Sequence, residues 1–247
     1  MSLLNQIEAM RRDGKKGFAM LIDPDKLDVE DLPALLEKVA GAAITCFLVG
    51  GSLLVNGNFR RVIPELKRLS NLPVYLFPGN AMQVVEGADG ILFLSLISGR
   101  NPEMLIGNHV ISAPLIRALD MEAIPTGYML VDTGSRTSVH YMSNTHPIPY
   151  DKEDIAACTA MAGEMLGLRL MYLDGGSGAP RTISPEMVRA VRKAVDVPIM
   201  VGGGIRSMDA AAALFAAGAD MIVVGNALEK SDSRGLLLEL NQLFNTV

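Results

Sequence analysis

Three glycine-rich phrases in the last third of the chain constrain its fold more than any other feature. They are residues 172–178 (Tyr-Leu-Asp-Gly-Gly-Ser-Gly), 201–206 (Val-Gly-Gly-Gly-Ile-Arg) and 224–226 (Val-Gly-Asn), and each follows a short aliphatic run. Glycine lets main-chain N–H groups approach an anion closely and adopts conformations that other residues avoid. Such turns at the ends of successive parallel strands are typical of the phosphate-binding mouth of a (β/α)8 barrel.

Short runs rich in Val, Ile, Leu and Met recur along the whole chain, with helical patterns between them. They predict eight strands, at residues 17–22, 44–49, 74–77, 90–94, 126–131, 169–173, 198–201 and 220–224. Eight strands that alternate with helices favour a closed α/β barrel over an open doubly wound sheet. Because 247 residues suit one such barrel, we expect residues 1–247 to form a single TIM-barrel domain.

Helix signals support the alternation of strands and helices. Residues 28–39 have apolar side chains at helical spacing, Ser184-Pro185 is a helix start, and the alanine-rich stretch 207–217 stops at Gly218. Residues 133–149 form the least regular stretch, which is long for a connection in a barrel. Barrels build their sites from such loops, so this stretch is a candidate part of the site.

Composition and charge exclude several classes of protein. The net charge is −5 and no basic run is present, which argues against a nucleic-acid partner. Cys46 and Cys158 lie far apart with no close Cys or His, so we expect reduced thiols and no zinc site. The N-terminus lacks the pattern of a signal peptide, and no apolar stretch could span a bilayer, so we expect a cytoplasmic protein without an integral membrane segment.

The glycine phrases predict a site for a phosphate group. The last two connections of a barrel are the usual place for phosphate, and Gly225-Asn226 precedes residues that could form one helical turn. A single Gly-Gly pair would be explained by a tight corner, whereas three clusters at consecutive strand ends favour phosphate binding. The pattern does not name the ligand, because flavin phosphate and sugar phosphates use the same kind of site.

Acidic side chains follow other strands of the predicted barrel. Asp23 and Asp25 come after the first strand and Ser52 after the second. Their oxygens suit a Mg²⁺ site, but Asp23 and Asp25 could equally cap the following helix while Ser52 bonds to the backbone. Asp132 and Asp174 end the fifth and sixth strands, and either could be a general base. For the loop histidines His140 and His146, a solvent-facing or hydrogen-bonded role is the simpler interpretation.

Taken in order, these motifs resemble those of the geranylgeranylglyceryl phosphate synthase family, with its related heptaprenylglyceryl phosphate synthases. The resemblance covers nearly the whole chain and includes, besides the glycine phrases, residues 21–26 (Leu-Ile-Asp-Pro-Asp-Lys), 49–52 (Val-Gly-Gly-Ser), 77–80 (Phe-Pro-Gly-Asn), 143–145 (Ser-Asn-Thr) and 147–149 (Pro-Ile-Pro). It implies a Mg²⁺-dependent prenyltransferase that joins a polyprenyl (geranylgeranyl) diphosphate to the 3-hydroxyl of sn-glycerol 1-phosphate. The products would be an ether-lipid precursor and diphosphate, and the enzyme would be a homo-oligomer, either a dimer or a hexamer.

The resemblance also implies roles for individual residues. Asp23 and Ser52 would bind Mg²⁺, and Asp174, with Tyr172, would act in catalysis on the attacking hydroxyl. Many relatives have Glu where this chain has Asp174. Sn-glycerol 1-phosphate would be bound by Tyr172, Leu173, Asp174, Gly175, Gly176, Ser177, Gly178, Gly203, Gly204, Gly225 and Asn226.

One departure from the family concerns a cation. Some members carry Lys where this chain has Leu21, and either Lys26 or Arg206 could supply the missing charge. The prenyl tail also needs an apolar groove. Apolar residues near the second to fourth strands could line it, although ordinary barrel packing explains them equally well: Leu53, Leu54, Phe77, Met82, Phe93, Leu96 and Ile97.

Two other functions fit parts of the pattern. Asp23 and Asp132 could form the acid–base pair of a sugar-phosphate isomerase, which would need no Mg²⁺ and no apolar groove. A barrel of this kind could also bind phosphate or FMN without catalysis, because fold alone does not determine function.

Overall fold

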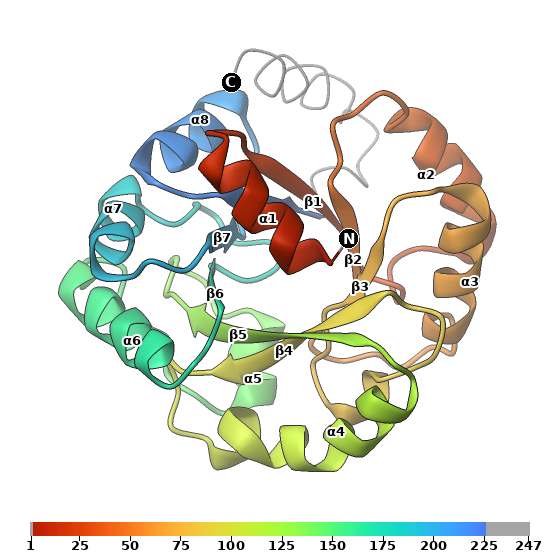
Figure 1. Ribbon diagram of the computed structural model, residues 1–247, viewed down its shortest axis with the longest axis horizontal. Coiled ribbons are helices and arrows are strands. Elements are labelled where there is room, and N and C mark those ends of the chain that lie inside the picture. Colours follow the sequence, from red (N-terminus) through yellow and green to blue (C-terminus); the bar gives the residue numbers. More distant parts are fainter. Residues whose placement is uncertain (1, 226–247) are drawn as a thin grey trace.

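Eight parallel strands close into a barrel in the computed structural model, which describes residues 2–225 (Figure 1). Each strand pairs with the next along the chain, and β1 pairs with β8, so the sheet has no free edge. The strands are β1 (Gly17–Ile22), β2 (Cys46–Val49), β3 (Val74–Leu76), β4 (Gly90–Leu96), β5 (Glu122–Leu130), β6 (Leu170–Asp174), β7 (Ile199–Gly202) and β8 (Met221–Val224). The predicted barrel class is therefore confirmed.

Most of the helices surround the barrel and cover the outer faces of the strands, whereas α1 and α5 lie over its ends (Figure 1). They are α1 (Leu3–Arg12), α2 (Leu32–Lys38), α3 (Phe59–Leu69), α4 (Asn108–Ala118), α5 (Ser138–Ser143), α6 (Glu153–Met165), α7 (Pro185–Ala194) and α8 (Met208–Ala217), with the short turns η1 (Val29–Asp31), η2 (Ala81–Gln83) and η3 (Glu103–Gly107). Ser184 caps α7 by accepting from Met187 N, as the sequence predicts, and α8 ends before Gly218, also as predicted. Ser207 caps the start of α8 by accepting from Ala210 N.

Most predicted boundaries lie within two residues of the observed ones, and the two largest differences each lie at a proline. The helix predicted at 28–39 is divided into the 3₁₀ turn η1 and α2, with Pro33 in the first turn of α2, where proline is favourable because the N–H that it lacks would have no partner within the helix. The predicted fifth strand begins after Pro125, whereas β5 begins at Glu122. Pro125 lacks an N–H but still accepts from Arg169 N, so it remains within the sheet.

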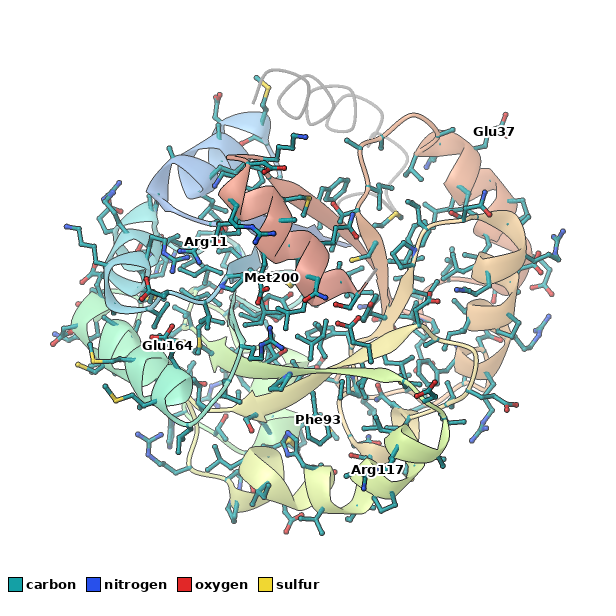
Figure 2. All side chains as sticks on the ribbon, viewed as in Figure 1. Arg11, Glu37, Phe93, Arg117, Glu164 and Met200 are labelled. Atoms are coloured by element: carbon teal, nitrogen blue, oxygen red, sulfur yellow. The ribbon has the colours of Figure 1, made fainter. Side chains whose placement is uncertain are left out.

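The apolar core has two layers because successive side chains of a strand face opposite sides. Inside the barrel lie Ala19, Cys46, Leu48, Leu92, Tyr172 and Met200, and between the strands and the helices lie Phe18, Met20, Phe47, Val49, Leu173 and Val201. Figure 2 shows Met200 toward the centre of the barrel, whereas Glu37 projects outward from α2. Side chains fill the barrel, so it is a packed core and not a pore.

Helix α1 covers the end of the barrel where the strands begin (Figure 1). Leu3, Leu4 and Ile7 are buried among the side chains of the barrel interior. The Glu122 carboxylate accepts from Leu3 N at 3.0 Å and Leu4 N at 3.4 Å, which satisfies N–H groups at the start of the helix. With the amino ends of the strands covered, the carboxyl ends are left for a site. Among residues 2–225, no helix has both the length and the apolar character needed to cross a bilayer.

Candidate active site

A cavity of about 630 Å³ lies at the carboxyl ends of the strands. One part of its wall carries Asp23, Gly51 and Ser52, from the connections after β1 and β2. Another part carries Tyr172, Asp174, Gly176, Ser177, Gly178, Gly203, Gly204 and Gly225. The acidic and glycine-rich groups, far apart in sequence, therefore share one cavity. Asn226, predicted to bind glycerol phosphate, lies outside the described residues.

The glycine-rich part of the wall, which we call the glycine rim (Gly176–Gly178, Gly203, Gly204 and Gly225), depends on close main-chain contacts. Gly203 has φ +84°, and a methyl group there would lie 2.7 Å from Gly175 N. Gly204 has φ +71°, and a methyl group there would meet the carbonyl of Arg181. Both positions combine a left-handed backbone with main-chain neighbours, so side chains are excluded and the loops after β6 and β7 are in contact.

Not every N–H group of the predicted phosphate site is available to a ligand. Gly175 N donates to Gly202 O at 3.1 Å, and Gly176 N donates to Asp174 Oδ1 at 2.9 Å. A methyl group on Gly175 would meet Thr133, so this glycine packs against the loop after β5 and is not part of the cavity wall. The predicted role of Gly175 thus changes from ligand contact to close packing between loops.

Asp174 is a buried carboxylate with two hydrogen-bond donors. Its Oδ2 accepts from the Tyr128 hydroxyl at 2.6 Å, and its Oδ1 accepts from Gly176 N. Burial raises the pKa of Asp174, while the hydrogen bonds from Tyr128 and Gly176 lower it. A buried carboxylate whose pKa is raised, and which two donors hold in place, suits proton transfer.

Tyr128 was missed by the sequence analysis. It lies inside β5, where its aromatic side chain reads as ordinary barrel packing. Its hydrogen-bond partner Asp174 is 46 positions away along the chain. The two side chains meet because β5 pairs with β6 in a register that puts Tyr128 opposite Tyr172. No local sequence signal identifies such a pair, since it depends on strand register.

Three aromatic rings lie together in the cavity wall, those of Phe77, Tyr128 and Tyr172. The ring centroids are 5.9 Å apart for Phe77 and Tyr128, 5.5 Å for Phe77 and Tyr172, and 5.4 Å for the two tyrosines. Burial and the nearby Asp174 carboxylate raise the pKa of Tyr172 well above its ordinary value, so its hydroxyl stays protonated. The neighbouring side chain of Leu173 packs in the outer core, so the substrate contact that the family resemblance implies for Leu173 would have to come from its main chain.

The acidic part of the wall is organised around Asp23. Its Oδ1 accepts from Asp25 N at 3.1 Å, and its Oδ2 pairs with Lys26 Nζ at 2.6 Å. Asp25 accepts from Val55 N at 2.6 Å and Asn56 N at 3.2 Å, so it secures the connection after β2. Neither carboxylate is the N-cap of the next helix, and both instead accept from main-chain N–H groups of nearby loops.

These residues fit a magnesium ion better than most other metals. Residues 2–225 contain no group of three or more His, Cys, Asp or Glu side chains that could hold a metal ion. Magnesium does not require one, because it is usually held by one or two carboxylates together with waters and substrate phosphates. Asp23 lies beside Gly51, whose added methyl group would be 3.4 Å from Asp23 Oδ1, and Ser52 follows in the same wall. The available donors are hard oxygens of the kind Mg²⁺ prefers.

Two cationic side chains line the cavity among the described residues, Lys26 and Arg206. Arg206 donates to Ala179 O at 2.6 Å and to Pro180 O at 3.0 Å, so its guanidinium holds the loop after β6. Lys26, in the connection after β1, is paired with Asp23 instead. The two cations that the sequence left as alternatives therefore have different partners.

Asp132 is not part of this cavity wall. It is exposed, and its Oδ1 accepts from Gly134 N at 2.9 Å within its own loop. Because Asp23 lines the cavity and Asp132 does not, the structure does not bring together the acid–base pair expected of an isomerase.

The apolar part of the cavity includes only some of the predicted groove residues. Leu53, Phe77, Phe93 and Leu96 line it, whereas Leu54 and Ile97 pack against the outer core and Met82 is 83% exposed. His109 of α4, which the sequence analysis left unassigned, also lines it, edge-on to Phe93 with centroids 4.3 Å apart.

Comparisons with known proteins agree with this geometry. The PcrB family model matches residues 9–241. A protein of Spirosoma linguale named geranylgeranylglyceryl phosphate synthase is 56% identical over 88% of this chain and 87% of the relative. A protein of the same name from Chitinophaga pinensis is 48% identical over 94% of this chain and 92% of the relative. The crystal structure of (S)-3-O-geranylgeranylglyceryl phosphate synthase from Thermoplasma acidophilum, in complex with its substrate sn-glycerol-1-phosphate, has a TM-score of 0.93 and 33% identity, with all of both chains covered. The chain therefore belongs to the PcrB family.

Proposed function

We propose that this protein is a prenyltransferase that joins a polyprenyl diphosphate, such as geranylgeranyl diphosphate, to the 3-hydroxyl of sn-glycerol 1-phosphate. The names of its relatives and the bound substrate of the Thermoplasma acidophilum enzyme support this function. The observation that carries the proposal is the shared cavity, in which a glycine rim, an acidic group and a buried carboxylate are all in the wall. A transferase with two anionic substrates needs these parts together.

The phosphate of glycerol phosphate would bind at the glycine rim. Since the N–H groups of Gly175 and Gly176 are already hydrogen-bonded, we assign the phosphate to the main chain of Gly203, Gly204 and Gly225. The glycerol hydroxyls would then extend toward Asp174, in the same part of the wall. This orientation follows from the order of the residues along neighbouring strand ends.

The reaction requires one bond to form and one to break. The glycerol 3-oxygen would bond to the allylic carbon as the carbon–oxygen bond to diphosphate breaks, with the electron pair leaving on diphosphate. Asp174 would accept the proton of the attacking hydroxyl, which its ionised form can do. Positive charge develops on the allylic carbon, and the faces of Phe77, Tyr128 and Tyr172 would stabilise it.

Mg²⁺ would be held by Asp23 and Ser52 and, when bound, would neutralise the departing diphosphate oxygens. Of the two cavity cations, Lys26 is the better candidate for a diphosphate contact. Its partner Asp23 is the proposed metal ligand, whereas Arg206 is occupied by two carbonyl groups. The prenyl tail would follow the apolar part of the wall at Leu53, Phe93 and Leu96.

A direct assay tests the proposal. The protein is incubated with labelled sn-glycerol 1-phosphate, Mg²⁺ and polyprenyl diphosphates of graded length, and lipids are extracted. We expect labelled ether lipid with Mg²⁺ and none with EDTA. Full activity in EDTA would overturn the metal assignment, and no product with any donor would overturn the function. A purified protein that carries flavin would instead favour the FMN-binding alternative.

A further inference from the structure

Helix α5 belongs to the long connection after β5, and it forms part of the cavity wall through Ser138, Val139, Met142 and Ser143. Its first turn is held by a reciprocal cap between Thr137 and His140. Thr137 N donates to His140 Nδ1 at 3.1 Å, and Thr137 Oγ1 lies 2.7 Å from the same nitrogen. A backbone N–H can only donate, so Nδ1 must be an acceptor, and the imidazole is neutral with its proton on Nε2.

The cap is in direct contact with the glycine rim. A methyl group on Gly176 would lie 2.5 Å from Thr137 Oγ1 and 2.9 Å from Thr137 Cγ2, so Thr137 packs on the bare main chain of Gly176. The N–H of Gly176 is in turn held by Asp174. One continuous set of contacts thus runs from the His140 ring, through Thr137 and Gly176, to the carboxylate proposed to accept the proton.

Charged groups from the connection after β5 and from strand β6 face His140. Burial lowers its pKa, the carboxylates of Asp132 after β5 and Asp174 in β6 raise it, and Arg136 in its own loop lowers it. The ring is therefore neutral near pH 7 and gains a proton in more acidic solution. If Nδ1 were protonated, it would be a donor itself and could no longer accept from the Thr137 N–H, so the cap would be lost.

We propose that neutral His140 is a positioning residue for glycerol phosphate: its cap seats Thr137 on Gly176 and so holds both the glycine rim and α5 in place. This inference rests on the proposed function. It predicts that the affinity for glycerol phosphate weakens in acid because His140 gains a proton, in addition to any effect of protonating the substrate phosphate.

Three variants separate this role from a general structural one. His140→Gln keeps an acceptor, because Gln is a usual residue at this position of a capping box, but it does not titrate. His140→Leu removes the acceptor. His146→Gln is the matched control, since His146 is exposed in the same loop. Binding of sn-glycerol 1-phosphate is measured by calorimetry across about pH 5.5–8, a range that brackets histidine titration.

We expect His140→Leu to bind glycerol phosphate about five- to thirty-fold more weakly than the wild type at neutral pH, the effect of losing a helix cap. His140→Gln should bind like the wild type at neutral pH and better than the wild type in acid. The second ionisation of the phosphate, near pH 6, affects all variants alike, so the ratio of wild type to His140→Gln isolates the histidine. His146→Gln should follow the wild type throughout.

The inference is overturned if His140→Leu binds like the wild type, or if His140→Gln loses affinity in acid in parallel with the wild type. If the wild type itself does not bind glycerol phosphate at neutral pH, the proposed function fails and this inference fails with it. Thermal melting of each variant shows whether weak binding by His140→Leu reflects unfolding. The behaviour of His140→Gln decides the question in either case.

Discussion

Tyr128→Phe removes one hydroxyl group and keeps the aromatic ring. In the wild type, this hydroxyl donates to Asp174 Oδ2 at 2.6 Å, and both side chains are buried. The variant leaves the carboxylate with Gly176 N as its remaining described donor. The ring contacts with Phe77 and Tyr172 do not need the hydroxyl, so the shape of the wall should be preserved.

The size of the effect follows from the strength of the lost hydrogen bond. A hydrogen bond to a charged acceptor contributes about 1.5–3 kcal/mol. The bond stabilises the ionised form of Asp174, so its loss raises the pKa of a carboxyl group that burial has already raised. At a pH well below both pKa values, the ionised fraction in the variant should therefore be about ten- to a hundred-fold lower than in the wild type.

The assay is the pH dependence of kcat for prenyl transfer. Because the ionised carboxylate accepts the proton, we expect the variant to lose activity on the acid side and to approach the wild type as pH rises. Tyr141→Phe is the matched control, since the Tyr141 side chain is 87% exposed. A loss of the same size at every pH would refute the reasoning, because it would mean that the Tyr128 hydroxyl contacts the substrate directly.

Three further predictions concern the two sides of the cavity. Asp23→Asn should abolish Mg²⁺-dependent transfer yet retain glycerol phosphate binding in calorimetry; wild-type turnover at saturating Mg²⁺ would contradict the metal assignment. Lys26→Met should bind Mg²⁺ more tightly without diphosphate, because Asp23 loses a competing cation, and bind diphosphate more weakly with Mg²⁺; unchanged affinities would exclude Lys26 from the site. Gly203→Ala should lower the Tm by roughly 2–8 °C through its left-handed backbone alone, whereas Gly57→Ala, with open space around it, should melt like the wild type.

Several parts of the site could be predicted because they depend on local sequence. A carboxylate or glycine directly after an aliphatic run lies at the end of a strand, and in a parallel barrel all such ends meet at one mouth. This reasoning predicts that Asp23, Ser52, Asp174 and the glycine rim lie at one mouth, and they do line one cavity. Local sequence also predicted the Ser184 cap of α7 and the end of α8 at Gly218, because helix caps depend on neighbouring residues.

Other parts could not be predicted, because they depend on which distant groups meet. The sequence alone determined the barrel class, the order of the strands and the residues at their ends, since periodicity and turn chemistry are local. Only the tertiary structure decided that Tyr128 donates to Asp174 and that Thr137 packs on Gly176. It also decided that Arg206 donates to carbonyl groups of the loop after β6, whereas Lys26 pairs with Asp23. These contacts follow from strand register and loop packing, in which a shift of one residue turns a side chain to the opposite face.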